Sequence, residues 1–136
     1  MNVYMFLEQV RMLDELIDAK NAERQRLLEI VTNVVPQVSD MPRGGGVSDR
    51  VGNAAVKLVT LAEETDRIID EYIDRRQEVI EILETLPPNE YAVLHRKYIQ
   101  YMRLGEIAEE MDRSIMQVWR YKQAGIERLA KMLAQK

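Results

Sequence analysis

Side chains that can hydrogen-bond to the edges of bases gather in one short segment near the C-terminus. Arg120 has the donor geometry to pair with guanine, and Gln117 and Gln123, which flank it, can pair with adenine. Ile115 and Met116 in the same segment offer only apolar contact, as to a thymine methyl group. One helix that presented these side chains on a single face could read the major groove of duplex DNA.

Cations that could bind phosphate surround this segment. Phosphate contacts fix the position of a protein on duplex DNA but carry no sequence information. We expect this role for four residues: Lys97, Arg103, Arg113 and Lys122. Ser114 is placed both to cap a helix and to donate a hydrogen bond to phosphate.

Catalytic and metal-binding chemistry has no comparable support. His95 is the single histidine and cysteine is absent, so the sequence predicts no metal site and no cofactor. Carboxylate pairs such as Glu63-Glu64 and Glu109-Glu110 have no nucleophile or phosphate-binding loop beside them, and exposed helix charge explains them. We therefore expect a protein that is not an enzyme.

Short helices are predicted to hold the chemical segment in place. Asn89 is placed to cap a helix that breaks at Leu104-Gly105, and a second helix follows over 106–111. Asp112-Arg113 then forms a turn, with Asp112 tolerating the left-handed region, and Ser114 caps the last helix. A steep crossing of these two helices needs a small residue, here Ala108, and apolar inner faces. Those faces are supplied by Ile107, Met111, Val118 and Tyr121.

The segment resembles region four of bacterial sigma factors, a helix-turn-helix domain. The matching motifs are Leu86-Pro87, Arg96-Lys97-Tyr98, Ile107-Ala108-Glu109, Ser114, Val118 and Gly125-Ile126-x-x-Leu129, within about 48 of the 136 residues. Gly125 replaces the usual alanine, which should weaken the last helix by up to ~1 kcal/mol. The resemblance implies that the base-facing residues are Ser114, Ile115, Met116, Gln117, Trp119, Arg120 and Gln123.

Residues 1–86 show a different pattern, with apolar residues in heptad phase over two long stretches. They predict helices at about 3–34 and 49–86, the second capped by Ser48, with a Gly-rich loop at 36–48. The predicted fold is thus all-α: a long antiparallel helical hairpin at 1–86, followed by the helix-turn-helix at 87–136. The apolar surface left on the hairpin predicts self-association, most simply as a homodimer. A hairpin before a lone region-four-like domain is similar to a group of phage and prophage transcriptional regulators.

Charge is divided unevenly between these two parts. Residues 1–86 hold 10 Lys and Arg against 17 Asp and Glu, a balance of −7, whereas residues 87–136 hold 9 against 6, a balance of +3. Only the C-terminal part is therefore expected to meet phosphate. No apolar run is long enough to span a bilayer and no signal peptide is evident, so we expect no membrane partner and a cytoplasmic location.

The sequence leaves three functions open. The first is a transcriptional regulator that binds duplex DNA and contacts host RNA polymerase through the hairpin. The second is a small terminase-like DNA-packaging subunit, which would form a ring of many copies. The third is an adaptor that binds polymerase without reading DNA.

Overall fold

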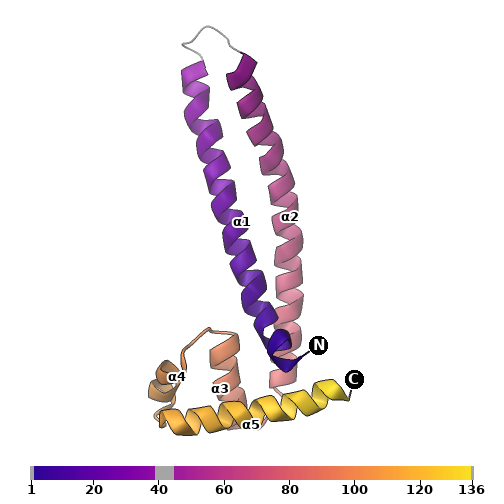
Figure 1. Cartoon of the computed structure of the whole chain (residues 1–136), viewed down its shortest axis with the longest axis vertical. Coiled ribbons are helices and arrows are strands. Elements are labelled where there is room, and N and C mark those ends of the chain that lie inside the picture. The colour runs from indigo at the N-terminus through magenta and orange to yellow at the C-terminus, as the bar shows by residue number, and fades with distance from the viewer. Residues whose placement is uncertain (1, 39–44, 136) are drawn as a thin grey trace. The chain divides into compact units, whose positions relative to one another are not determined.

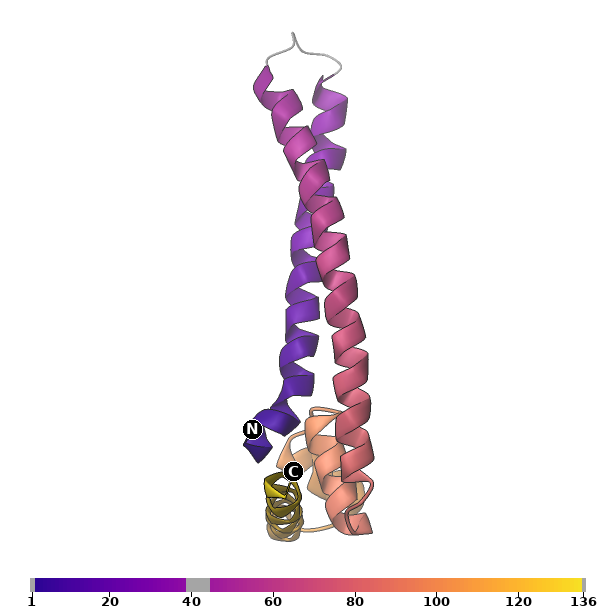
Figure 2. The same ribbon diagram turned by 90° about the vertical axis from the view of Figure 1, so that its right-hand side faces the viewer.

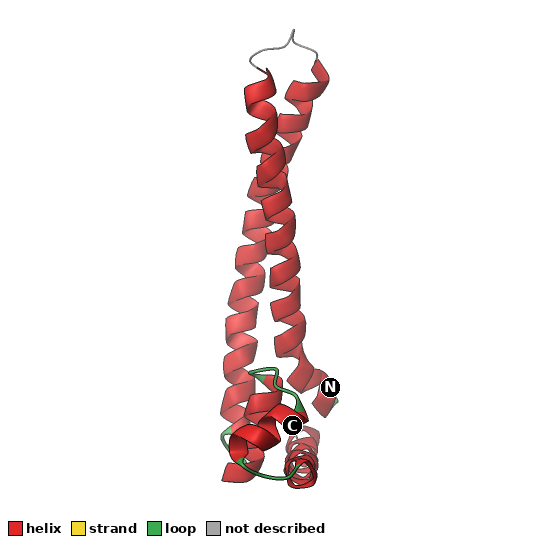
Figure 3. Cartoon of the chain, turned by 90° about the vertical axis from the view of Figure 1, so that its left-hand side faces the viewer, coloured by secondary structure: helices red, strands yellow, loops and turns green. Residues whose placement is uncertain are grey.

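Helices make up most of the part of the chain that the structure describes. The computed structural model describes residues 2–38 and 45–135, which form five helices and contain no strand, in agreement with the predicted all-α class (Figures 1 and 3). The helices are α1 (Val3–Val38), α2 (Gly45–Leu83), α3 (Pro88–Tyr98), α4 (Leu104–Met111) and α5 (Ile115–Ala134).

The two long helices have different ends from those predicted. α1 continues to Val38 and α2 already begins at Gly45, so Ser48 lies inside α2 and is not its cap. Proline and glycine weaken the end of a helix without preventing a terminal turn, which explains the error. Residues 39–44 of the predicted Gly-rich loop lie outside the described residues. α2 ends at Leu83, before the predicted 86, and the Thr85 and Leu86 N–H groups instead donate to the Ile82 and Leu83 carbonyls in tighter turns.

The first residues of α3 and α4 also differ from those predicted. Pro88 is the first residue of α3, so Asn89 lies inside the helix and does not cap it. Proline suits this position because its fixed φ is helical and the first N–H has no partner in the helix. The break expected at Leu104-Gly105 comes earlier: α3 ends at Tyr98, and Tyr101 takes a left-handed φ of 59° in the connection to α4.

Contacts divide the chain into two compact units, residues 14–71 and residues 1–13 with 72–136. In the unit 14–71, α1 and α2 pack through a small apolar cluster that contains Leu27, Ala54 and Leu61. Lys20 on α1 also forms an ion pair of 3.1 Å with Glu64 on α2. These contacts hold the two long helices side by side within the unit.

The other unit contains the main hydrophobic core. The first turns of α1 and the last turns of α2 pack against α3 and α5, which Figure 2 shows at the lower end of the view. The buried residues of this core are Phe6, Leu7, Val10, Val79, Leu83, Leu86, Leu94, Tyr98, Ile99, Ile126 and Leu129. This unit therefore takes in residues on both sides of Leu86, and it carries every residue of the candidate interface.

Candidate nucleic-acid interface

A second, smaller core fixes α5 against α4. It consists of Val93 from α3, Ile107 and Ala108 from α4, and Val118 from α5, all buried. The partly buried Met111 and Tyr121 pack against it, as do Met102 and Leu104. This confirms the inner faces predicted for the two helices. The small Ala108 side chain, 5% exposed, is part of this packing, as the sequence required.

The turn between α4 and α5 has the predicted backbone. Asp112 adopts φ 54° and ψ 51°, the left-handed conformation that aspartate tolerates. The Arg113 N–H donates to the Ala108 carbonyl at 2.9 Å, a bond that satisfies one of the free carbonyls at the end of α4. α4 therefore stops after two turns and the chain reverses into α5.

Ser114 begins α5 with a capping box. Its hydroxyl accepts a hydrogen bond from the Gln117 N–H at 3.1 Å, and its own N–H donates to the Gln117 side-chain oxygen at 3.2 Å. This confirms the predicted cap. Gln117 uses its amide oxygen in the cap, which leaves the two amide N–H donors of its side chain for another partner.

The first turns of α5 expose one face and bury the other. Val118 is fully buried, whereas Ile115, Met116 and Trp119 are 58%, 57% and 46% exposed. Three of the other expected base-facing residues, Ser114, Gln117 and Arg120, are exposed, and Gln123 is half-buried. The face opposite the small core thus combines a large apolar area with the Arg120 guanidinium.

The charge of one expected phosphate-binding cation, Lys122, acts on another, Lys97. Burial lowers the pKa of Lys97 first, and the charges of Lys122 and Arg11 lower it further, while Glu8 acts in the opposite direction. Lys97 lies on α3 and Lys122 on α5, and both are half-buried. The other two expected cations, Arg103 and Arg113, are exposed at the beginning of α4 and in the turn before α5.

Arg11 is a third cation near Lys97, and the sequence analysis did not foresee it. It belongs to the first turns of α1, 86 residues before Lys97 in the chain, within the part counted as acidic. Its guanidinium carbon lies 5.1 Å from the centre of the Tyr101 ring, a cation–π distance. No sequence signal could reveal it, because the heptad pattern does not say which helix α1 faces.

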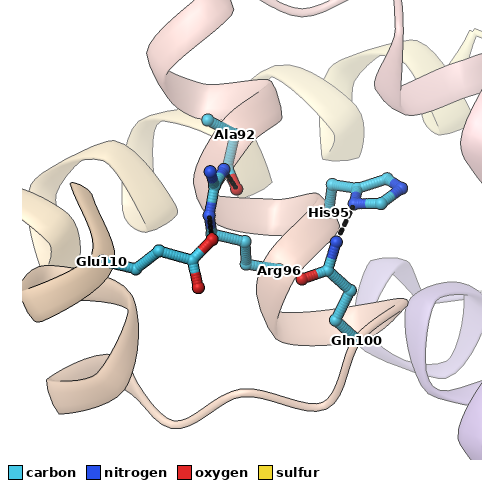
Figure 4. A network of polar contacts seen from close by, with 5 residues as sticks. All are labelled: Ala92, His95, Arg96, Gln100 and Glu110. Carbon is cyan, nitrogen blue, oxygen red and sulfur yellow. Dashed lines mark hydrogen bonds and ion pairs between the residues drawn. The ribbon is translucent and has the colours of Figure 1, made fainter.

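Polar contacts of Arg96 join α3 to α4 (Figure 4). The Arg96 Nε donates to the Glu110 Oε1 at 3.0 Å, and another of its guanidinium nitrogens donates to the Ala92 carbonyl at 3.1 Å. In the same figure, the Gln100 amide lies 3.2 Å from the His95 Nδ1. Burial, followed by the charges of Arg76 and Arg96, lowers the pKa of His95. The Arg96–Glu110 contact links α3 to α4, whereas the Gln100–His95 contact lies within the end of α3 and the connection after it.

Two other kinds of site are absent from the described residues. No group of three or more histidine or acidic side chains within 2–38 and 45–135 could hold a metal ion. Across the same ranges, every helix is too short or too polar to cross a lipid bilayer.

Comparison with known proteins gives one match. A family model described as "Protein of unknown function (DUF1492)" matches residues 33–130, which is 98 of the 136 residues. The matched range includes the end of α1 from residue 33, the whole of α2, α3 and α4, and α5 as far as residue 130. Neither the curated proteins nor the solved structures contain a significant match.

Proposed function

The chain belongs to the DUF1492 family, and we propose that it is a sequence-specific transcriptional regulator whose helix α5 enters the major groove of duplex DNA. In this proposal α4, the turn at Asp112 and α5 form a helix-turn-helix of the sigma region-four type. The long helices α1 and α2 form a hairpin that binds a second copy of the chain, host RNA polymerase, or both. The regulator is of the phage or prophage type.

The observation that carries the proposal is the division of α5 into two faces. Val118 and its neighbours lock the helix onto α4, while Ile115, Met116, Trp119 and Arg120 remain exposed on consecutive turns. A recognition helix needs this arrangement, because side chains can reach base edges only from a face that the protein does not cover. The first turn of α5, which follows Ser114, also has backbone N–H groups that could donate to a phosphate.

Each exposed residue has a role in this proposal. Arg120 donates to guanine, Gln117 and Gln123 pair with adenine, and Ile115 and Met116 contact thymine methyl groups. Trp119 packs its ring against the wall of the groove. The phosphate contacts come from Lys97, Arg103, Arg113 and Lys122, and they give the complex a strong dependence on salt.

Selection from a random duplex pool, followed by fluorescence anisotropy on the selected site, tests the proposal. We expect binding that weakens as salt rises, and a loss of roughly tenfold or more in affinity for the double variant Arg113→Ala/Arg120→Ala. The matched control is Arg67→Ala/Arg75→Ala, which removes two exposed arginines from α2 and should retain most of the affinity. Equal affinity of the two double variants, or binding that ignores salt, would contradict the proposal.

The apolar character of the exposed face supports one other function. Ile115, Met116 and Trp119 together are more typical of a protein contact than of a phosphate-rich surface. A chain of net charge −4 that used this face on a polymerase subunit would act as an adaptor without DNA readout. Capture of polymerase, together with no measurable duplex affinity at low salt, is the result expected of an adaptor.

Self-association is proposed through the long helices. Apolar side chains are exposed on both, with Met5 and Met12 on α1 and Val56, Val59 and Ile73 on α2. A second copy would cover such side chains, and a twofold dimer is the commonest arrangement. The mass in solution separates the candidates: a dimer supports the regulator, and about eight or more copies would support a small terminase-like packaging subunit.

A further inference from the structure

We infer that Gln117 reads its base through its two amide N–H donors alone, and that the base it selects is guanine. This inference rests on the proposed function and makes the specificity of α5 more precise. Residue type alone pairs both Gln117 and Gln123 with adenine, whereas the hydrogen bonds of the folded chain separate the two glutamines.

The cap of α5 holds the amide oxygen of Gln117. The Ser114 N–H donates to this oxygen at 3.2 Å, while the Gln117 N–H donates to the Ser114 hydroxyl at 3.1 Å. Because a backbone N–H needs an acceptor, this contact fixes which end of the amide faces the start of the helix. Within residues 2–38 and 45–135, the side chain of Gln117 forms no other hydrogen bond. Its amino group therefore remains available to a ligand.

Gln117 also lies where a recognition helix meets the edges of bases. It is the third residue of α5 and is exposed, and bases are contacted by the N-terminal residues of a recognition helix. Arg120 follows three residues later and is also exposed, so the two side chains are neighbours on the helix surface. Val118 between them is fully buried in the small core. Gln117 thus belongs to the same exposed side of α5 as Arg120.

A side chain that offers donors alone favours guanine in the major groove. Guanine presents two adjacent acceptors, N7 and O6, whereas adenine presents one acceptor, N7, beside the N6 amino donor. The bidentate pair with adenine therefore uses the glutamine oxygen as well as the nitrogen. To present both atoms side by side, the amide of Gln117 would have to turn away from Ser114 and give up a bond of the cap. Guanine is the base that Gln117 can bind while the cap stays intact.

Gln123 is not constrained in this way. It lies six residues further along α5, is half-buried, and its side chain forms no hydrogen bond within the described ranges 2–38 and 45–135. Both ends of its amide are available for the bidentate pair with adenine. Gln123 is therefore the matched control for Gln117, being of the same type on the same helix but outside the cap.

Selection from a random duplex pool, run in parallel for the wild type and its variants, gives the base preference at each position of the site. Gln117→Ala should abolish the preference at one position, which identifies the base that Gln117 reads. At that position the wild type should prefer guanine to adenine by about tenfold. Adenine, or any other base than guanine, at this position overturns the inference.

Gln117→Glu separates the cap from the reading of the base. Glutamate at this position also accepts from the N–H of the capping residue, so the unfolding temperature should not fall below that of the wild type. It has no donor, so the preferred base should change from guanine to cytosine, whose N4 amino group donates. Gln123→Glu changes the net charge equally and should leave guanine at the Gln117 position.

The failure of this inference can be told apart from the failure of the proposed function. Where the glutamate variant binds too weakly for selection, the base at the position altered in Gln117→Ala decides the outcome. A wild-type site at which neither Gln117 variant changes any preference overturns the inference and leaves the proposed function intact. A wild-type chain that selects no duplex site would overturn both.

Discussion

At the residue scale, the polar side chains near α5 divide into those that build the site and those that remain available to a ligand. Ser114, Asp112 and Arg96 are used internally, in the cap, in the turn and in the link between α3 and α4. Arg120 and Arg113 are exposed. Residue type alone does not separate these roles, because an arginine that ties two helices together has the same chemistry as one that binds DNA.

His95 makes the stability of this unit depend on pH. Its pKa in the folded protein is lowered from 6.5, first by burial, then by Arg76 and Arg96, with Glu84 opposing. The unfolded chain therefore takes up a proton first as the pH falls, so stability is fully present above about pH 6.5 and declines below it. Between about pH 7.5 and about pH 5.5, the unfolding temperature of the wild type should fall further than that of His95→Gln. Parallel curves for the two proteins would contradict this expectation.

At the element scale, Gly125 allows α5 to lie close to α3. A Cβ at this position would sit 2.7 Å from the Leu94 Cδ1 and 3.4 Å from the Glu90 Cβ. Leu94 is fully buried and has little room to move. The glycine that departs from the region-four pattern is therefore a packing residue, and its low helix propensity is offset by this contact.

Gly125→Ala should destabilise the protein in spite of the better helix propensity of alanine. Overpacking of a buried contact costs about 1–3 kcal/mol, against a gain of up to ~1 kcal/mol in propensity, so we expect a net loss of about 1 kcal/mol. Gly105→Ala is the control, because no atom lies within 4 Å of its added Cβ, and it should be neutral or slightly stabilising. Denaturant unfolding measures both, and a Gly125→Ala protein more stable than the wild type would refute the packing role.

The ion pair between Arg96 and Glu110 should contribute a small coupling between α3 and α4. The two side chains are 27% and 49% exposed, so solvent screens the pair and we expect about 0.5 kcal/mol from a double-mutant cycle to alanine at low salt. Arg96→Ala alone should cost more than Glu110→Ala, since it also removes the bond to the Ala92 carbonyl. The Arg75–Glu78 pair within α2, whose arginine is more exposed, serves as a reference that should show a smaller coupling. A coupling that persists unchanged in high salt would show that the contact is not mainly electrostatic.

At the scale of the whole molecule, the beginning of α1 and the end of α2 belong to the same core as α3 and α5. Leu7 and Val10 from α1 are fully buried in the cluster that also holds Leu94 and Leu129. Ten residues at the beginning of the chain thus help to support helices more than eighty residues away. Residues 87–136 by themselves would leave this face of α3 and α5 uncovered.

Leu7→Ala should therefore destabilise the C-terminal helices, although it changes α1. A fully buried leucine replaced by alanine costs about 2–5 kcal/mol, and duplex binding should be lost at the temperature where this unit unfolds. Met5→Ala on the exposed side of the same helix turn is the control, and it should change stability by no more than about 0.5 kcal/mol. Hydrogen exchange of the α5 backbone amides measures this loss of stability directly. Unchanged protection of α5 in Leu7→Ala would mean that the core does not couple the two segments.

The sequence by itself determined the helical class, the α4–turn–α5 packing residues, the Asp112 turn and the Ser114 cap. These features are local: a cap, a turn and a 3.6-residue period depend on neighbours a few positions away. Only the tertiary structure decided that the Arg11 guanidinium lies over the Tyr101 ring, that Gly125 meets Leu94, and that the main core crosses Leu86. Such contacts join residues tens of positions apart, and periodicity shows that a helix has an apolar face without showing which helix covers it.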